Sequence, residues 1–460
     1  MARPRTVHRC SECGASAPRW AGRCVACGTW NSLVEEQPSA PPAAGATSAR
    51  WGGEQAVPLV DVDVAGATPR PTGLAEFDRV LGGGLVPGSV TLLGGEPGVG
   101  KSTLLLQVLR ALATGGARVL LVSAEESAQQ VRLRAERLGD LPPTLLLLSG
   151  TDLAAAARAI VGLDPELVVI DSVQTLADAS TAGVPGSVAQ VRTCGDALVR
   201  LAKDRDVPLV LVSHVTKEGT LAGPRVLEHL VDTVLTVEGD RHHALRLLRA
   251  VKHRFGATGE LGLFEMEDTG LRAVSDPYRF LLGDRRPGVP GSAVLPAVEG
   301  QRALLVELQA LVAPAGPGAT PRRSAQGLDP GRLALLLAVL DRRAGVAVGP
   351  VDVFASVVGG IRVAEPAADL ALVLAVASAC QQVPVPADLA AFGEVGLGGE
   401  LRQVPHASRR LAEVARVGFH RALVPAFTPD GPPDVELVRV SSLHEAVQVA
   451  LAPRLAGTAG

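Results

Sequence analysis

One glycine-rich segment constrains the fold of this chain more than any other part of its sequence. It joins an apolar run at residues 90–93 to a helix-like run at 104–109, and it consists of Gly95, Glu96, Pro97, Gly98, Val99, Gly100, Lys101, Ser102 and Thr103. A plain glycine turn is the alternative, but chance rarely places this whole pattern between a strand and a helix. In such a loop the backbone N–H groups surround a polyphosphate, Lys101 reaches the outer phosphates, and the Ser102 hydroxyl holds Mg²⁺. We therefore predict a nucleotide site for ATP and Mg²⁺.

Length and composition limit the class of protein. A chain of 460 residues is expected to form two or three domains. The net charge of −3 implies that any contact with nucleic acid is local. No apolar run reaches the ~18 residues of a membrane span, and the N-terminus has no signal-peptide pattern. These features predict a cytoplasmic protein without membrane contact.

Two C-x-x-C pairs near the N-terminus predict a zinc finger over residues 1–35. The cysteines of the two pairs, which are ten residues apart, are Cys10, Cys13, Cys24 and Cys27. Four thiolates at this spacing are typical of a tetrahedral Zn²⁺ site, whereas disulfides are disfavoured in a cytosolic ATPase. Arginines and two tryptophans surround the cysteines. The module therefore suits nucleic acid or a protein partner, and both interpretations stay open.

The remainder begins with a flexible linker at 36–59, rich in Pro, Ala, Gly and Ser, and continues with alternating strand and helix patterns at 60–280. The expected strands are Val90–Leu93, Arg118–Ser123, Thr144–Leu148, Leu167–Ile170, Leu209–Val212, Val231–Val237 and Leu245–Val251. The expected helices are Lys101–Ala113, Ala128–Leu138, Leu153–Val161 and Val188–Lys203. This order predicts an α/β domain with a mainly parallel sheet, in which the later strands pair antiparallel at one edge.

Polar residues follow three of these strands, where the chemistry of a parallel sheet is expected. Asp171 ends a buried strand and suits the metal's water shell beside Ser102. Glu125 and Glu126 follow another strand. One carboxylate can align and deprotonate the water that attacks the γ-phosphate, while an acidic helix start explains Glu126 better. His214 follows a third strand and is a candidate sensor of the terminal phosphate, although a lone histidine is more often structural.

Taken together, these motifs resemble bacterial RadA, also called Sms, a family of RecA-like DNA repair and recombination ATPases. The resemblance covers nearly the whole chain and depends on the four-cysteine finger, the phosphate loop, Thr72–Asp78, Gly82–Leu85, Ala124–Ser127 and His214–Gly219. The family's Lys-Asn-Arg-Phe-Gly signature is changed here to Lys252-His253-Arg254-Phe255-Gly256. The role of the family's asparagine is therefore in question at His253.

The resemblance implies a DNA-dependent ATPase that acts in recombinational repair as a hexameric ring and drives branch migration. ATP would lie between subunits, with Lys252 and Arg254 reaching the neighbour's nucleotide, although a solvated basic face also explains these cations. Glu125 would be the general base and His214 the sensor. Single-stranded and branched DNA and a RecA-type recombinase would be the partners, with DNA contacts from loops at 175–191 and 217–225. A regulatory ATPase resembling the clock protein KaiC is the alternative.

The last domain, at 288–460, resembles the protease domain of Lon, which uses a Ser–Lys dyad. Ala367 holds the nucleophile's place, and no lysine follows Lys252. Because a methyl group cannot attack a carbonyl and arginine stays protonated, we predict a proteolytically inactive α/β domain. It is expected to support ring assembly and to provide a DNA or partner surface, for which the candidate residues, if they are not merely a solvated helix face, are Arg409, Arg410, Arg416 and Arg421.

Overall fold

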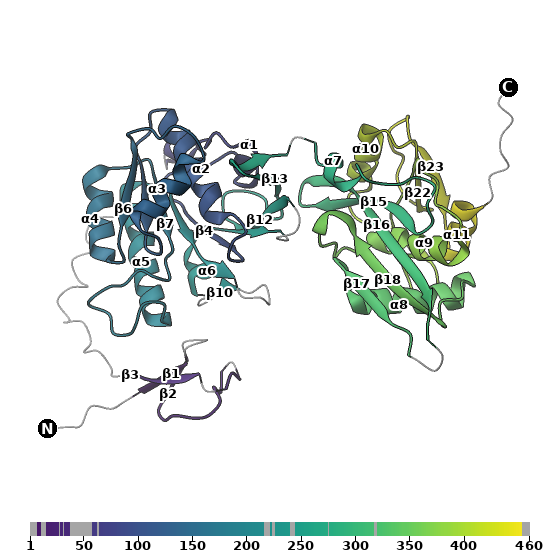
Figure 1. Ribbon diagram of the computed structural model, residues 1–460, viewed down its shortest axis with the longest axis horizontal. Helices are drawn as coiled ribbons and strands as arrows, with labels where there is room; N and C mark the ends of the chain where they lie inside the picture. Colours follow the sequence, from purple (N-terminus) through teal and green to yellow (C-terminus); the bar gives the residue numbers. More distant parts are fainter. Residues whose placement is uncertain are drawn as a thin grey trace. The chain divides into compact units, whose positions relative to one another are not determined.

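The computed structural model describes residues 7–10, 15–26, 28–30, 32–36, 58–61, 64–215, 221–222, 226–239, 244–274, 276–316 and 320–452. Cys13, Cys27, most of the linker and most of the predicted loop at 217–225 lie outside this part of the chain. The chain divides into two compact units, Met1–Ala273 and Val274–Gly460 (Figure 1). No helix of the described residues is both long and apolar enough to span a bilayer.

A nine-stranded sheet forms the core of the first unit, in the order β14-β13-β12-β11-β4-β8-β7-β5-β6. The strands from β11 to β6 pair in parallel, and those from β11 to β14 pair antiparallel. The strands are β4 (Val90–Gly95), β5 (Val119–Ser123), β6 (Leu145–Ser149), β7 (Leu167–Asp171), β8 (Leu209–Val212), β11 (Thr233–Glu238), β12 (Leu245–His253), β13 (Leu261–Glu267) and β14 (Gly270–Ala273). This confirms the predicted parallel sheet with an antiparallel edge.

Helices cover both faces of this sheet, so its central strands are apolar throughout rather than alternating. One apolar core contains Leu93 of β4 together with residues of α1 (Ala75–Val80), α2 (Lys101–Thr114) and α3 (Ala128–Glu136). The other contains the neighbouring Leu92, and the helices on that face are α4 (Leu153–Leu163), α5 (Val188–Arg205) and α6 (Val226–Leu230). Adjacent residues of one strand thus belong to different cores, as the pleat of a strand requires.

The segment Thr72–Asp78 contains two acidic side chains that fix the position of α1. The carboxylate of Asp78 accepts hydrogen bonds from the backbone N–H and the hydroxyl of Thr72, at 2.8 and 2.7 Å. Buried Glu76 accepts from the N–H of Leu263 in β13, at 2.8 Å. These two acids therefore fix α1 against the chain before it and against the antiparallel edge of the sheet.

The second unit is a separate α/β layer built on a seven-stranded mixed sheet, in the order β17-β18-β16-β15-β19-β22-β23. Its strands are β15 (Ser292–Glu299), β16 (Arg302–Pro314), β17 (Arg323–Gln326), β18 (Val351–Val357), β19 (Leu389–Ala391), β22 (Arg421–Pro425) and β23 (Glu436–Val440). Its helices are α7 (Tyr278–Leu281), α8 (Pro330–Ala344), α9 (Ala368–Gln381), α10 (Ala407–Val417) and α11 (Leu443–Leu451). α9 is buried over almost its whole length because it packs between the sheet and the helices α8 and α11.

Candidate nucleotide and metal sites

The phosphate loop connects the end of β4 to the start of α2. Gly98 and Gly100 have φ values of 81° and 111°, a region that glycine enters without the steric cost of a side chain. A Cβ at Gly100 would also lie 2.6 Å from Cε of Met266, which packs over the loop from β13. The backbone around the loop is therefore reserved for glycine at these positions.

Lys101 points back into this loop. Its Nζ donates hydrogen bonds to the carbonyl oxygens of Gly95 and Glu96, at 2.7 and 3.0 Å, and the residue is only 5% exposed. Burial lowers the pKa of Lys101 from its ordinary value, while the nearby carboxylates of Asp171 and Glu125 act in the opposite direction. The ammonium group is thus held at the loop, close to where a phosphate would bind.

Asp171, Ser102 and Glu125 meet at the carboxyl ends of β7 and β5. The Ser102 side chain lies close enough to the Asp171 carboxylate to stabilise its charged form. Burial is the main cause of a raised pKa at Asp171, Ser102 opposes it, and the charge of Glu125 raises it further. Glu125 accepts a hydrogen bond from the hydroxyl of Ser172. A hydroxyl and a carboxylate are hard oxygen ligands, so Ser102 and Asp171 fit Mg²⁺.

The two adjacent glutamates after β5 have different surroundings. Glu126 forms an ion pair with Arg134 of α3. Ser127 begins α3 through a capping box with Gln130, so the chain turns away from the sheet immediately after these glutamates. Glu125 instead lies near Lys101 and contacts Ser172, which follows β7. Of the two acids, Glu125 therefore faces the predicted nucleotide site.

His214 lies just beyond the end of β8. It belongs to the short strand β9 (His214–Val215), where its backbone pairs with Ala222 of β10 (Leu221–Ala222). The position of its side chain lies outside the described part of the chain. The preceding Ser213 donates its N–H to the carbonyl of Leu93, which places this turn beside the strand that leads into the phosphate loop.

Lys252 and Arg254 lie toward the opposite end of the sheet from the phosphate loop. In β11, Val237 pairs with Gly95 whereas Val234 pairs with Lys252, so three residues of strand, about 10 Å, separate the two levels. Nζ of Lys252 donates to the carbonyls of Glu228 and Val231, both at 2.7 Å. The structure therefore does not bring these cations to the phosphate loop of the same chain.

Arg254 and His253 pack next to Lys252. Arg254 forms an ion pair of 3.1 Å with Asp232, a buried acid that also accepts from the N–H of Val90. The ring of His253 contacts the hydroxyl of Thr233 at 3.0 Å. Burial lowers the pKa of His253. His253, which stands where the family signature has asparagine, therefore has a hydrogen-bond partner, Thr233, within this unit.

Two side chains that support the loop had no motif to mark them. Arg246 of β12 is 6% exposed, and its Nε donates to the carbonyl of Val99 at 3.1 Å. Gln107 of α2 forms two hydrogen bonds with the backbone of Leu271, at 3.0 and 2.9 Å. The available signal for Arg246 was an arginine within an otherwise apolar strand, Leu245–Leu248. Both contacts join the antiparallel edge to the loop and its helix.

The N-terminal module is a small antiparallel ribbon with strands β2 (Ser16–Ala17), β1 (Val7–Cys10) and β3 (Leu33–Glu36). Cys10 and Cys24 are buried together beside Leu33. The turn after Cys24 is closed by a hydrogen bond of 2.8 Å from the N–H of Gly28, whose φ is 76°. Two buried thiols beside a tight glycine turn fit a metal knuckle, and the predicted ligands Cys13 and Cys27 lie outside the described residues.

Aromatic side chains are exposed on the same ribbon. Trp20 and Trp30 are 58% and 70% exposed, and a Cβ at Gly22 would lie within 4 Å of both rings. The guanidinium of Arg23 lies 5.8 Å from the centre of the Trp30 ring. These indoles are therefore available to a partner, without distinguishing nucleic acid from protein.

The start of α9 holds the position that was compared with a protease nucleophile. Ala367 is buried at the helix start, and its carbonyl accepts from the N–H of Gly393 at 3.0 Å. The neighbouring Asp369 is paired with Arg332 of α8. A cavity of about 260 Å³ lies beside this ion pair. A methyl group and an ion pair thus occupy the region.

The expectation that Arg410 belongs to a solvated or DNA-binding surface is wrong. Arg410 is 1% exposed, pairs with Glu365 and donates to the carbonyl of Pro296 at 2.6 Å. Arg416 and Arg421 are partly exposed but form ion pairs with acids of the same unit. The helix period alone did not show that α10 turns one arginine into the protein.

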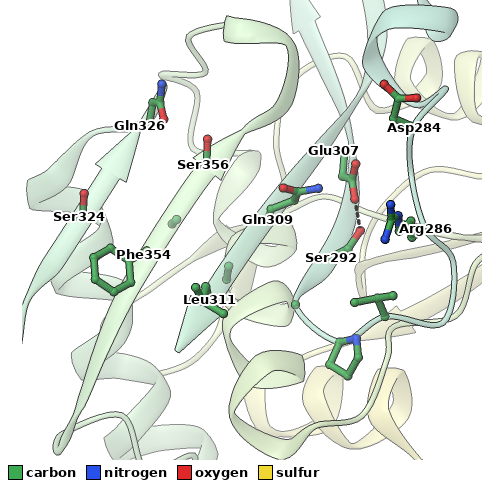
Figure 2. A pocket seen from close by; sticks show the side chains of 15 residues that line it. Asp284, Arg286, Ser292, Glu307, Gln309, Leu311, Ser324, Gln326, Phe354 and Ser356 are labelled. Carbon is green, nitrogen blue, oxygen red and sulfur yellow. Dashed lines mark hydrogen bonds between the residues drawn. The ribbon is translucent and has the colours of Figure 1, made fainter. Parts of the chain in front are cut away.

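An open cavity of about 530 Å³ lies over the strands β15 to β18 of the second unit. Figure 2 shows side chains from neighbouring strands along its floor, with the exposed apolar residues Leu311 and Phe354 beside polar ones. At its edge the hydroxyl of Ser292 donates to the buried carboxylate of Glu307. All the residues lining the cavity belong to the second unit, and no sequence motif pointed to it.

Known proteins are similar in sequence to nearly the whole of this chain. A family model described as an AAA domain matches residues 57–220, and one described as a rubredoxin metal binding domain matches residues 8–35. A relative from Bacillus subtilis named DNA repair protein RadA is 44% identical over 458 residues, which is 98% of this chain and 100% of the relative. Proteins of the same name from Pseudomonas aeruginosa and Mycolicibacterium smegmatis are 48% and 46% identical, covering 97% and 98% of this chain and 99% and 98% of their own lengths. A solved KaiC-like protein from Pyrococcus horikoshii aligns with a TM-score of 0.39 and 19% identity over 45% of this chain and 99% of its own.

Proposed function

The chain belongs to the RadA family of DNA repair proteins, and from this we propose that it is a DNA-dependent ATPase that drives branch migration during recombinational repair. The AAA domain match and the name of the relatives support the general function of a DNA repair ATPase. The cluster of Lys101, Ser102, Asp171 and Glu125 at one edge of the sheet is the observation that supports ATP hydrolysis. A lysine, a hydroxyl and two carboxylates in one place suit phosphoryl transfer to water.

We assign a role to each member of this cluster. Lys101 would exchange its bonds to the Gly95 and Glu96 carbonyls for bonds to the β- and γ-phosphates. Ser102 and Asp171 would hold Mg²⁺, which neutralises charge on the phosphates when bound. Glu125 would orient and deprotonate the attacking water, with the Ser172 hydroxyl fixing the orientation of the carboxylate. His214, at the turn beside Leu93, would report the γ-phosphate to the loop that follows.

A ring of subunits would account for the position of Lys252 and Arg254. They lie too far down the sheet to reach the phosphate loop of their own subunit, so a role in hydrolysis requires a nucleotide held by a neighbour. Both side chains are oriented by local partners, Lys252 by two carbonyls and Arg254 by Asp232. We propose that they act in trans within a hexamer, where positive charge stabilises the transferring phosphoryl group.

The N-terminal module and the second unit would contribute to ring assembly and to the binding of partners. The zinc ribbon, with its exposed tryptophans, would contact DNA or a RecA-type recombinase. The second unit would act as a scaffold and not as a protease, because Ala367 offers no nucleophile and no lysine follows Lys252. Single-stranded and branched DNA would be the substrates of the motor.

ATP hydrolysis measured with and without single-stranded DNA tests the proposal, with Lys101→Ala as the blank. We expect a several-fold stimulation by DNA that the variant lacks, and branch migration that stops in the variant while DNA binding persists. Asp171→Asn should also abolish Mg²⁺-dependent turnover. Hydrolysis that is indifferent to DNA would favour a regulatory ATPase, and branch migration by Lys101→Ala would refute the motor.

Mixed assemblies test the trans assignment. Lys252→Ala keeps its own phosphate loop, whereas Lys101→Ala keeps its own trans cations. If Lys252 acts on a neighbour, mixing the two inactive variants creates some interfaces that hold both residues and restores part of the activity. An unmixed sample of each variant is the control, and no recovery on mixing would contradict action in trans.

A further inference from the structure

The outer side of the phosphate loop is held by Arg246, which comes from the antiparallel edge of the sheet. Its Nε donates to the carbonyl of Val99 across 147 residues of sequence, and its Nη1 donates to the carbonyl of Leu245 at 3.0 Å. An arginine that is 6% exposed is uncommon, because burial of a guanidinium requires compensating partners. Here one of those partners is a carbonyl of the phosphate loop, that of Val99.

This contact sets the orientation of one peptide plane. The only cis peptide bond within the described residues joins Asp171 to Ser172, so the bond between Val99 and Gly100 is trans. In a trans peptide the C=O and the following N–H point in opposite directions. With the Val99 carbonyl drawn toward Arg246, the N–H of Gly100 points away from Arg246. Gly100 itself, at a φ of 111°, has no side chain to resist rotation of this plane.

We propose that Arg246 is a positioning residue that keeps the Gly100 N–H directed at the phosphates of ATP. This inference rests on the nucleotide site proposed above and deepens it. Without the hydrogen bond from Arg246, the peptide plane can turn and present the carbonyl of Val99 to the phosphates. The attraction between the Gly100 N–H and a phosphate is then replaced by repulsion between the carbonyl oxygen and that phosphate. Arg246 thus acts through the loop and has no contact with the reacting atoms.

A second residue offers an independent way to disturb the same contact. Arg246 passes beside Gly239, where an added Cβ would lie 2.5 Å from Cδ of Arg246 and 3.0 Å from the carbonyl of Leu245. Gly239→Ala therefore displaces the arginine side chain while leaving its charge and the sequence of the loop intact. The two positions together define a double-mutant cycle.

The experiment measures KM and kcat for ATP in Arg246→Met, Arg246→Lys and Gly239→Ala. The lost hydrogen bond to phosphate predicts a KM for ATP about tenfold or more higher in Arg246→Met, with a smaller change in kcat. Arg246→Lys should recover much of this loss because its ammonium can reach the same carbonyl. The matched control is Arg249→Met, which removes an arginine of the same strand that pairs with Glu238 at 3.2 Å and should leave KM unchanged.

The double variant separates positioning from a general effect on folding. If Gly239 acts only through Arg246, the single variant Gly239→Ala raises the KM for ATP. The same substitution then causes no further rise in a protein that already carries Arg246→Met. Additive effects, or a KM in Arg246→Met within twofold of wild type, would overturn the inference. If Arg246→Met does not fold, Gly239→Ala still decides because it keeps the buried charge, and a KM for ATP within twofold of wild type in this variant would overturn the inference. Wild-type protein with no hydrolysis above the Lys101→Ala blank would instead refute the proposed ATPase.

Discussion

Replacement of Glu365 by glutamine tests whether the second unit depends on a buried ion pair. Glu365 accepts hydrogen bonds from both terminal nitrogens of Arg410, at 2.9 and 2.5 Å, and Arg410 is 1% exposed. Glutamine has nearly the same size, so the change removes a charge without opening a cavity. The guanidinium then has only neutral acceptors, namely the new amide oxygen and the carbonyls of Pro296 and Pro405, the latter two at 2.6 and 3.2 Å.

The size of the effect follows from burial. Removing one partner of a buried ion pair costs about 3–5 kcal/mol because the other charge stays in the protein without compensation. The Glu365 side chain is 23% exposed, which admits some water, so we expect about 3 kcal/mol. With a urea dependence of about 2 kcal/mol per molar, the unfolding midpoint of this unit should fall by about 1.5 M.

Hydrogen exchange of the full chain in increasing urea gives the measurement, because it resolves the two units. The buried helix α9 reports the second unit, and α2 is the internal reference in the first. Asp430→Asn is the matched control, since this carboxylate is 95% exposed in its pair with Arg439 and should contribute less than about 1 kcal/mol. The reasoning fails if Glu365→Gln shifts the midpoint of α9 no more than the control does. The same reasoning predicts that Glu365→Leu combined with Arg410→Met regains only part of the loss, because the N–H of Val298, which donates to Glu365 at 2.9 Å, also loses its acceptor.

Three further outcomes are expected. For the proposed zinc site, Cys24→Ser should abolish the binding of Zn²⁺, and unchanged metal content by atomic absorption would remove the zinc assignment. Burial raises the pKa of Cys194 to about 11, above the value of about 9 in the unfolded chain. The buried thiol should therefore stabilise the folded state fully below pH 9, and this contribution to the free energy of unfolding should be lost between pH 9 and 11. Cys194→Ala should reduce the decline of stability over this pH range, as measured by urea unfolding. Gly84→Ala places a Cβ 2.0 Å from the carbonyl of Arg70 at a φ of 133° and should cost about 3 kcal/mol or more, whereas Gly116→Ala, at a φ of 95° with open space, should cost about 1 kcal/mol.

Much of the first unit could be predicted because its signals are local. The strands around Leu92 and Val169 are apolar on both faces, and only a sheet covered on both sides requires that pattern. The phosphate loop was recognisable because the glycines, the lysine and the hydroxyl that are typical of phosphate binding lie within one short segment. The roles assigned to these residues and to His214 stay proposals, as do the domain boundaries.

The arginines show where such reasoning stops. A buried arginine and an exposed one have the same letter, and the periodicity of α10 did not separate Arg410 from Arg409. Arg410 is buried because Glu365, which is 45 residues earlier in the chain, lies opposite it. The sequence contained both residues but no local pattern that paired them.

The sequence by itself determined the features formed by neighbouring residues: the phosphate loop, the cysteine pairs, and the alternation of strands and helices. Their backbone geometry depends on residues within a few positions, so a short pattern is sufficient. Only the tertiary structure decided which distant groups meet, such as Glu125 with Ser172 and Arg246 with Val99. These contacts depend on the order of strands in the sheet, where β11 pairs with β4 and β12 pairs with β11. Strand order is set by the packing of the whole unit, which no single segment encodes.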